Sequence, residues 1–155
     1  MNTAHLHLVF NHFPVIGTLF GLALLAWGHW RKSEELKRVS LGALVIVTLL
    51  SIPAYLTGEP AEDAVENLPG VTHHVIEEHE EAAQVAFTAQ ILLGAGALAG
   101  LLVFRRQRTV PAWFGGSATL LALIVFLLMA RTANLGGEVR HTEIRSGPRS
   151  QSHDD

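Results

Sequence analysis

The sequence contains no cysteine among its 155 residues. This absence excludes disulfides, thiolate metal sites, iron-sulfur ligation and covalent haem attachment through a Cys-x-x-Cys-His motif. Methionine is almost as scarce, because Met1 is terminal and Met129 is the only other one. Any cofactor must therefore be held by nitrogen and oxygen ligands.

Charged residues are also scarce, at 16% of the chain against 49% hydrophobic residues, and the net charge is -3. No run of basic residues is interleaved with aromatic ones, so nothing in the sequence points to nucleic acid as a partner. Four long apolar blocks, at 19–27, 41–52, 85–104 and 113–130, contain no charged residue at all. A soluble core of this size would alternate with polar faces, whereas a lipid bilayer tolerates such blocks.

These blocks predict an all-α integral membrane four-helix bundle in residues 1–145. We expect the helices at about 6–30, 39–56, 75–104 and 111–134. Gly58 and Pro60 cannot continue the second helix, and Pro111 occupies the favoured first-turn position of the last one. The polar residues 146–155 are predicted to form a disordered tail.

The basic residues predict the orientation of the bundle, because short cytoplasmic loops retain Lys and Arg. Seven of the eleven lie in two short turns, at 31–38 and 105–108, and none lies between Val39 and Phe104, where eight acidic residues lie. We therefore expect both termini and the acidic loop on the non-cytoplasmic side. The predicted location is the inner (cytoplasmic) membrane of a bacterium, crossed several times.

In this topology eight of the nine histidines fall on the non-cytoplasmic side, and only His29 lies at the inner end, where Trp27 and Trp30 would anchor it. Histidines from distant segments can meet there only through the bundle. The candidate residues for binding a haem are His5, His7, His12, His79, His141 and, for the propionates, Arg131. The candidate ligands for a metal ion are His12, His79, His74, Glu78 and His141.

His12 precedes Pro14 just inside the membrane, where an ionisable residue is a functional candidate. The alternative is that His12 satisfies backbone groups freed by the proline. His79 directly precedes the apolar part of the third helix. His74 and Glu78 are four residues apart, so they would either share a metal ion or form a solvated hydrogen bond.

Small residues recur along one face of the third helix at near-helical spacing. Such residues serve close helix packing in membranes. A second interpretation is a slot that admits a flat macrocycle such as haem. The residues on this face are Ala83, Ala86, Gln90, Gly94, Ala97 and Leu101.

The chain also resembles a group of bacterial four-helix membrane proteins described only as a domain of unknown function. Their motifs are H-x-x-x-x-H-F-P at the start, T-G and an acid after the second helix, a histidine opening the third, and G-G-E with a following histidine near the end. The matching residues here are His7 to Pro14, Thr57-Gly58-Glu59, His79, and Gly136-Gly137-Glu138 with His141. The resemblance implies no established reaction, but it favours His7, His12, His79 and His141 as site residues.

Three functions remain open. The first is a b-type haem protein that transfers electrons between the quinone pool and a periplasmic carrier such as a cytochrome, alone or within a larger complex. The second is a membrane protein that binds zinc, copper or iron through its histidines and carboxylates. The third is an accessory subunit that packs against other membrane subunits. An electron-transfer or accessory role is favoured over a stand-alone enzyme.

Overall fold

The computed structural model describes residues 3–67 and 71–141, so the predicted tail lies outside the described residues. This part of the chain is helical and contains no strand. Its helices are α1 (Thr3–Phe10), α2 (His12–Trp30), α3 (Glu34–Leu56), α4 (Gly58–Glu62), α5 (His73–Val103) and α6 (Ala112–Arg140).

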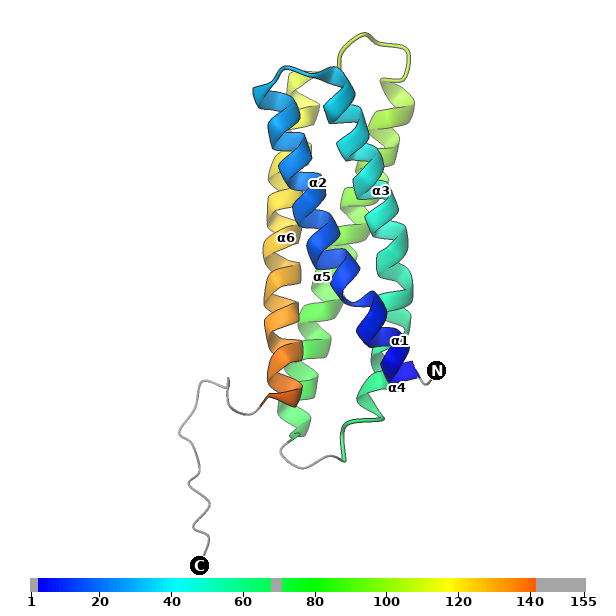
Figure 1. Ribbon diagram of the computed structural model, residues 1–155, viewed down its shortest axis with the longest axis vertical. Helices are drawn as coiled ribbons and strands as arrows, with labels where there is room; N and C mark the ends of the chain where they lie inside the picture. Colours follow the sequence, from blue (N-terminus) through cyan, green and yellow to red (C-terminus); the bar gives the residue numbers. More distant parts are fainter. Residues whose placement is uncertain (1–2, 68–70, 142–155) are drawn as a thin grey trace, which may run out of the picture.

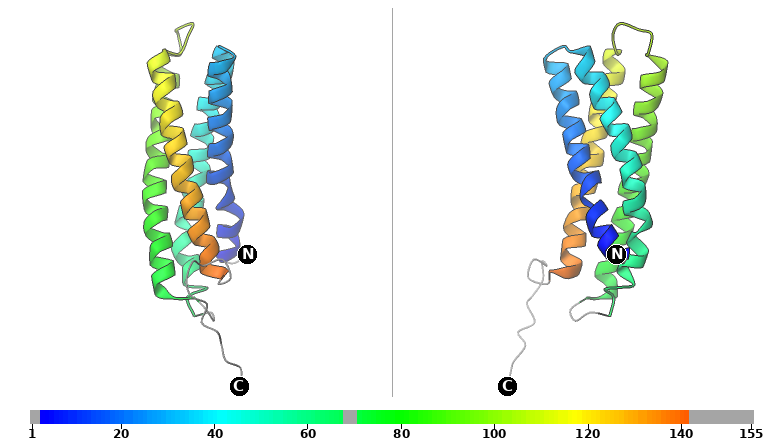
Figure 2. Two further views of the ribbon diagram at one scale, coloured as in Figure 1. Left: turned by 90° about the vertical axis from the view of Figure 1, so that its left-hand side faces the viewer. Right: turned by 45° about the vertical axis from the view of Figure 1, so that its right-hand side comes forward.

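Four segments are long and apolar enough to cross a membrane, at 4–30, 34–56, 73–103 and 112–139. α2 packs on α3 and α6, and α5 packs on the same two helices from the opposite side. Successive spans run in opposite directions, as Figures 1 and 2 show. The predicted all-α membrane four-helix bundle is confirmed, and the chain is a multi-pass membrane protein.

The outward faces of all four spans are apolar. Ile16, Leu49, Leu92 and Leu120, one from each span, are each about 60% exposed. Exposed apolar surface on this scale is unfavourable in water and favourable against lipid tails. The bilayer therefore covers the outside of the bundle.

Small residues allow the helices to approach closely inside the bundle. A Cβ added at Gly21 would lie 2.5 Å from a methyl of Leu44, and one added at Gly94 would overlap the side chain of Thr48. Gly100 is covered in the same way by Phe114. Neighbouring helices thus already occupy the small face of α5. These contacts support the close-packing interpretation of the small residues.

A hydrogen-bonded cluster of three side chains joins three spans at mid-depth. Thr18 of α2 donates to Oε1 of Gln90 at 2.9 Å, and Nε2 of Gln90 donates to Oγ1 of Thr48 at 2.8 Å. Thr48 in turn donates to the carbonyl of Leu44 at 2.9 Å. All three side chains are buried, and each has a partner, which is what a polar group needs in an apolar core.

The first span consists of two helices rather than the single one predicted. The break lies at Asn11, three residues before Pro14. Proline has no N–H to donate to the carbonyl of Phe10, and its ring crowds the preceding turn. α1 therefore leaves the axis of α2 and packs beside α3 and α4 (Figure 1).

Two other boundaries differ from the prediction. α3 begins at Glu34, five residues early, because the Ser33 hydroxyl accepts a hydrogen bond from the Leu36 N–H at 3.3 Å and caps the helix. α6 continues to Arg140, through Gly136 and past the predicted end at 134. Glycine weakens a helix without stopping it, and here it also makes room for a neighbouring side chain.

The two short turns at the other end of the bundle are tied together by charged side chains. Glu34 accepts a hydrogen bond from the Val110 N–H at 2.6 Å. Arg38 donates to the carbonyls of Phe104 and Gln107 at 3.1 and 2.9 Å, at the end of α5. Terminal helix carbonyls lack intrahelical partners, so this arginine completes the hydrogen bonding of α5.

Candidate functional site

The histidine-rich segments converge on one end of the bundle. α1 begins there, α3 and α6 end there, and α5 begins there, at the lower end of Figure 1. The first and last described residues lie at this same end, as an even number of spans requires (Figure 1). The side of the membrane that this end faces stays a prediction.

His7 reaches from α1 to the end of α3. Its Nδ1–H donates to the backbone carbonyl of Ala54 at 3.0 Å, and Oγ1 of Thr57 lies 3.4 Å from the same nitrogen. Ala54 is in the last turn of α3, where carbonyls have no intrahelical donor. Gly58 lies beside the ring, and a Cβ there would be 3.8 Å from His7 Cε1.

His79 makes the equivalent contact on the other side. Its Nδ1–H donates to the backbone carbonyl of Thr132 in α6 at 3.1 Å. A Cβ added at Gly136, one turn further along α6, would lie only 2.9 Å from His79 Cε1. The glycine therefore allows the imidazole to reach the backbone of α6.

These contacts determine which ring nitrogen carries the proton. A carbonyl can only accept, so the neutral form of each ring must be protonated on Nδ1. The lone pair then lies on Nε2 of both His7 and His79. Within the described residues, neither Nε2 has a hydrogen-bond partner. A backbone carbonyl on Nδ1 is the usual support for a histidine that binds a metal centre through Nε2.

We call His7 and His79, with Thr57 and Gly136 beside them, the paired-histidine site. Both rings are half-buried, and they belong to α1 and α5, the two helices that begin at this end of the bundle. Asn11 is one helical turn deeper than His7 on the same face of the first span. Its side-chain oxygen is buried and has no hydrogen-bond partner.

An acidic group borders this end of the bundle. Glu62, at the end of α4, is half-buried, and burial together with the neighbouring Glu80, Glu59 and Asp63 raises its pKa. Each neighbouring carboxylate disfavours a further negative charge. A cation or a hydrogen-bond donor at this end would relieve the repulsion.

His12 is placed differently from what the sequence predicts. It is exposed on the outside of the bundle, and its Nδ1 lies 3.3 Å from the carbonyl of Leu8 in its own span. The break at Asn11 separates His12, the first residue of α2, from His7 in α1. His12 has its printed hydrogen bond within its own span, whereas His7 and His79 each bond to another helix.

The remaining predicted haem residues lie on exposed positions. His5, His141 and Arg131 are all exposed, and none of them is part of the paired-histidine site as described. His74 and Glu78 approach to 3.6 Å, with both side chains largely exposed. That geometry is the solvated i, i+4 pair that was one of the two interpretations.

Within residues 3–67 and 71–141, no group of three or more histidine, aspartate or glutamate side chains is arranged to hold a metal ion. The predicted metal set of His12, His79, His74, Glu78 and His141 is thus not assembled in the described structure. Among the predicted ligands, His7 and His79 are the ones whose rings are half-buried and hydrogen-bonded to the backbone of another helix.

Several residues of the site escaped the sequence analysis. Ala54 and Thr132 contribute backbone carbonyls, which have no signature in a sequence. Gly136 and Thr57 belong to the short motifs of the resemblance, so those motifs were the available signal. Comparison with protein-family models, curated proteins and solved structures gives no match to this chain, and the resemblance stays a prediction.

Proposed function

We propose that this chain is a b-type haem protein of the membrane, in which His7 and His79 would hold the haem. One observation carries the proposal: both imidazoles are anchored through Nδ1 to backbone carbonyls and keep Nε2 available on the same end of the bundle. Both His7 and His79 are among the residues that the sequence predicts to bind haem.

The donor set fits haem better than a bare metal ion. Haem iron receives four nitrogens from its own macrocycle and needs two ligands from the protein, whereas a structural zinc site needs four. Two imidazoles are present, thiolates are absent from the sequence, and no larger ligand group is found in the described residues. Bound haem supplies one-electron transfer.

The surrounding residues would hold the two histidine rings in place and supply polar groups to the site. The Ala54 and Thr132 carbonyls orient the two rings and increase the basicity of Nε2. Thr57 donates to the Pro53 carbonyl at 2.7 Å, so its oxygen is free to accept from His7. The unpaired oxygen of Asn11 offers a buried acceptor one turn deeper.

The position of the site along the span supports the direction of electron transfer. His29 at the opposite end follows His7 by 22 residues, roughly 33 Å at the rise of a helix. Electrons would therefore enter and leave at the histidine end, from quinol in that half of the membrane to a carrier outside it. The proposal includes the possibility that this protein is a subunit of a larger membrane complex.

Haem content of purified variants tests the proposal. Pyridine extraction of the wild-type protein should give type b haem near one per chain, and His7→Ala and His79→Ala should each lose most of it. His12→Ala and His29→Ala are matched controls that should retain it. Equal loss of haem from all four variants would contradict the assignment of His7 and His79 as the haem ligands. A colourless wild-type protein that retains zinc or copper would favour the metal-ion alternative.

A further inference from the structure

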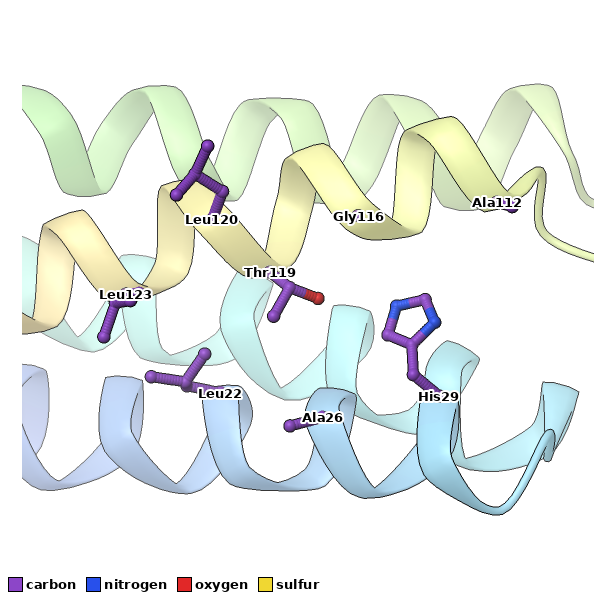
Figure 3. A pocket seen from close by; sticks show the side chains of 8 residues that line it. All are labelled: Leu22, Ala26, His29, Ala112, Gly116, Thr119, Leu120 and Leu123. Carbon is purple, nitrogen blue, oxygen red and sulfur yellow. The ribbon is translucent and has the colours of Figure 1, made fainter.

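A groove runs between α2 and α6 at the end of the bundle opposite the paired-histidine site. Its volume is about 550 Å³. Leu22, Ala26 and His29 line it from α2, and Gly116, Thr119 and Leu123 line it from α6 (Figure 3). It is open along its side, so it communicates with the lipid around the bundle. We call it the α2–α6 groove.

One polar atom in the wall of this groove has no partner. Nε2 of His29 is buried and makes no hydrogen bond. The ring is pressed against the backbone of α6, where a Cβ at Gly115 would lie 2.5 Å from His29 Cε1. Thr119 points toward His29 in Figure 3, but its hydroxyl donates to the Gly115 carbonyl at 2.8 Å. Since buried polar groups are normally paired, an occupant of the groove is expected to supply the missing partner.

The charges and aromatic residues around His29 indicate which occupant fits. Exposed Trp27 and Trp30 mark the level of the lipid headgroups, and Arg31 and Lys32 follow directly and are exposed. From His29 toward the middle of the bundle the lining is apolar down to Leu22 except for Thr119, whose hydroxyl is paired, over a length of about 10 Å at helical rise. The groove thus has the cations Arg31 and Lys32 at its headgroup end, the ring nitrogen of His29 next to them, and an apolar lining toward the middle of the bundle. Basic pockets between membrane helices bind anionic headgroups.

We propose that the α2–α6 groove binds one anionic phospholipid. One acyl chain lies along Ala26, Gly116 and Leu22, an ester carbonyl accepts a hydrogen bond from Nε2–H of His29, and the phosphate lies near Arg31 and Lys32. This site is independent of the paired-histidine site and of any haem bound there.

Filling the groove tests the proposal, and the chain offers matched controls. A Cβ at Gly116 meets nothing within 4 Å, so Gly116→Leu is expected to extend into the groove from α6, and Ala26→Leu from α2. Gly42 is equally open, and Ala23 is exposed on α2, but neither lines the groove. Gly42→Leu and Ala23→Leu are therefore the controls.

Each protein is reconstituted with mixed phosphatidylglycerol and phosphatidylcholine, extracted in mild detergent, and its retained phospholipid is counted by mass spectrometry. The wild type and both controls should retain phosphatidylglycerol in preference to phosphatidylcholine. Gly116→Leu and Ala26→Leu should lose it, and His29→Phe should lower its affinity about fivefold, the effect of one hydrogen bond.

The proposal is overturned if the wild type shows no preference between the two lipids, or if the filled variants retain as much phosphatidylglycerol as the controls. It is also overturned if the filled variants convert a dimer to a monomer with no change in lipid, because the groove would then be an interface between two copies. If Gly116→Leu does not fold, Ala26→Leu and His29→Phe decide the outcome.

Discussion

The imidazole of His79 donates to the backbone carbonyl of Thr132 at 3.1 Å and thereby links the beginning of α5 to the last turns of α6. The link depends on Gly136, because any larger residue there would meet the ring. His7 makes the corresponding link between α1 and the end of α3. Each histidine is thus held by a helix other than its own, which is how a bundle can present two ligands at one end.

The contact between His79 and Gly136 predicts the effect of a single methyl group. Gly136→Ala places Cβ 2.9 Å from His79 Cε1, so the ring must shift away from the Thr132 carbonyl. We expect most of the bound haem to be lost and the free energy of unfolding to fall by about 1 to 3 kcal/mol. Gly96→Ala is the control, because a Cβ there meets nothing within 4 Å. It should keep the haem and stabilise the helix by about 0.5 to 1 kcal/mol. Full haem content in Gly136→Ala would contradict the role of the glycine.

The buried cluster of Thr18, Gln90 and Thr48 predicts a loss of stability without a loss of cofactor. Gln90→Leu removes both interhelical hydrogen bonds and leaves the Thr18 hydroxyl without its acceptor. We expect a destabilisation of about 1 kcal/mol, the usual magnitude for such bonds inside membranes. Gln84→Leu on the exposed side of the same helix should have little effect. Thermal unfolding in detergent measures both, and equal midpoints for wild type and Gln90→Leu would show that the cluster contributes nothing.

The raised pKa of Glu62 predicts how stability changes with pH at the histidine end. Burial and the nearby acids raise this pKa above its ordinary value of 4.5, so the folded state holds the proton more tightly than the unfolded state. Protonated Glu62 therefore contributes to the free energy of unfolding. This contribution is fully present below pH 4.5 and is lost as pH rises through the raised pKa. Glu62→Gln should therefore be more stable than wild type at neutral pH and equally stable in acid. Unfolding midpoints across this range check the prediction, and a constant difference at every pH would contradict it.

The distribution of basic residues predicts the orientation of the bundle in the membrane. The chain has no cysteine, so an introduced one is the only thiol. Asn67→Cys, in the exposed acidic loop, should react in intact cells with a reagent that cannot cross the membrane. Gln107→Cys, exposed in a basic turn at the other end, should react only after permeabilisation. The reverse pattern would place the paired-histidine site on the cytoplasmic side.

The fold was predictable because its signals are local. Four apolar blocks without charge predict the number of spans, and Pro111 marks the start of the last helix. The cap at Ser33 was missed, so the second helix begins five residues before its predicted start. The break at Asn11 follows from Pro14, although the sequence analysis treated this span as one helix. The extension of α6 past Gly136 was missed because glycine is a common stop signal, whereas here the helix continues and the glycine makes room for the His79 ring.

The site was predictable only in part. His7 and His79 were among the candidates, since both fall on the end with the acidic loop and match the motifs of the resemblance. Their partners Ala54 and Thr132 contribute only carbonyl groups, which every residue has. His12 was a candidate because it lies next to Pro14, and the structure places it at an exposed position at the start of α2.

The account is tested most directly by one visible absorption spectrum of the purified protein, recorded oxidised and then reduced. Haem held by His7 and His79 would give a Soret band that shifts on reduction, with sharp alpha and beta bands that are absent from the His7→Ala and His79→Ala proteins. A protein that folds as this bundle and binds no haem when haem is supplied would contradict the account.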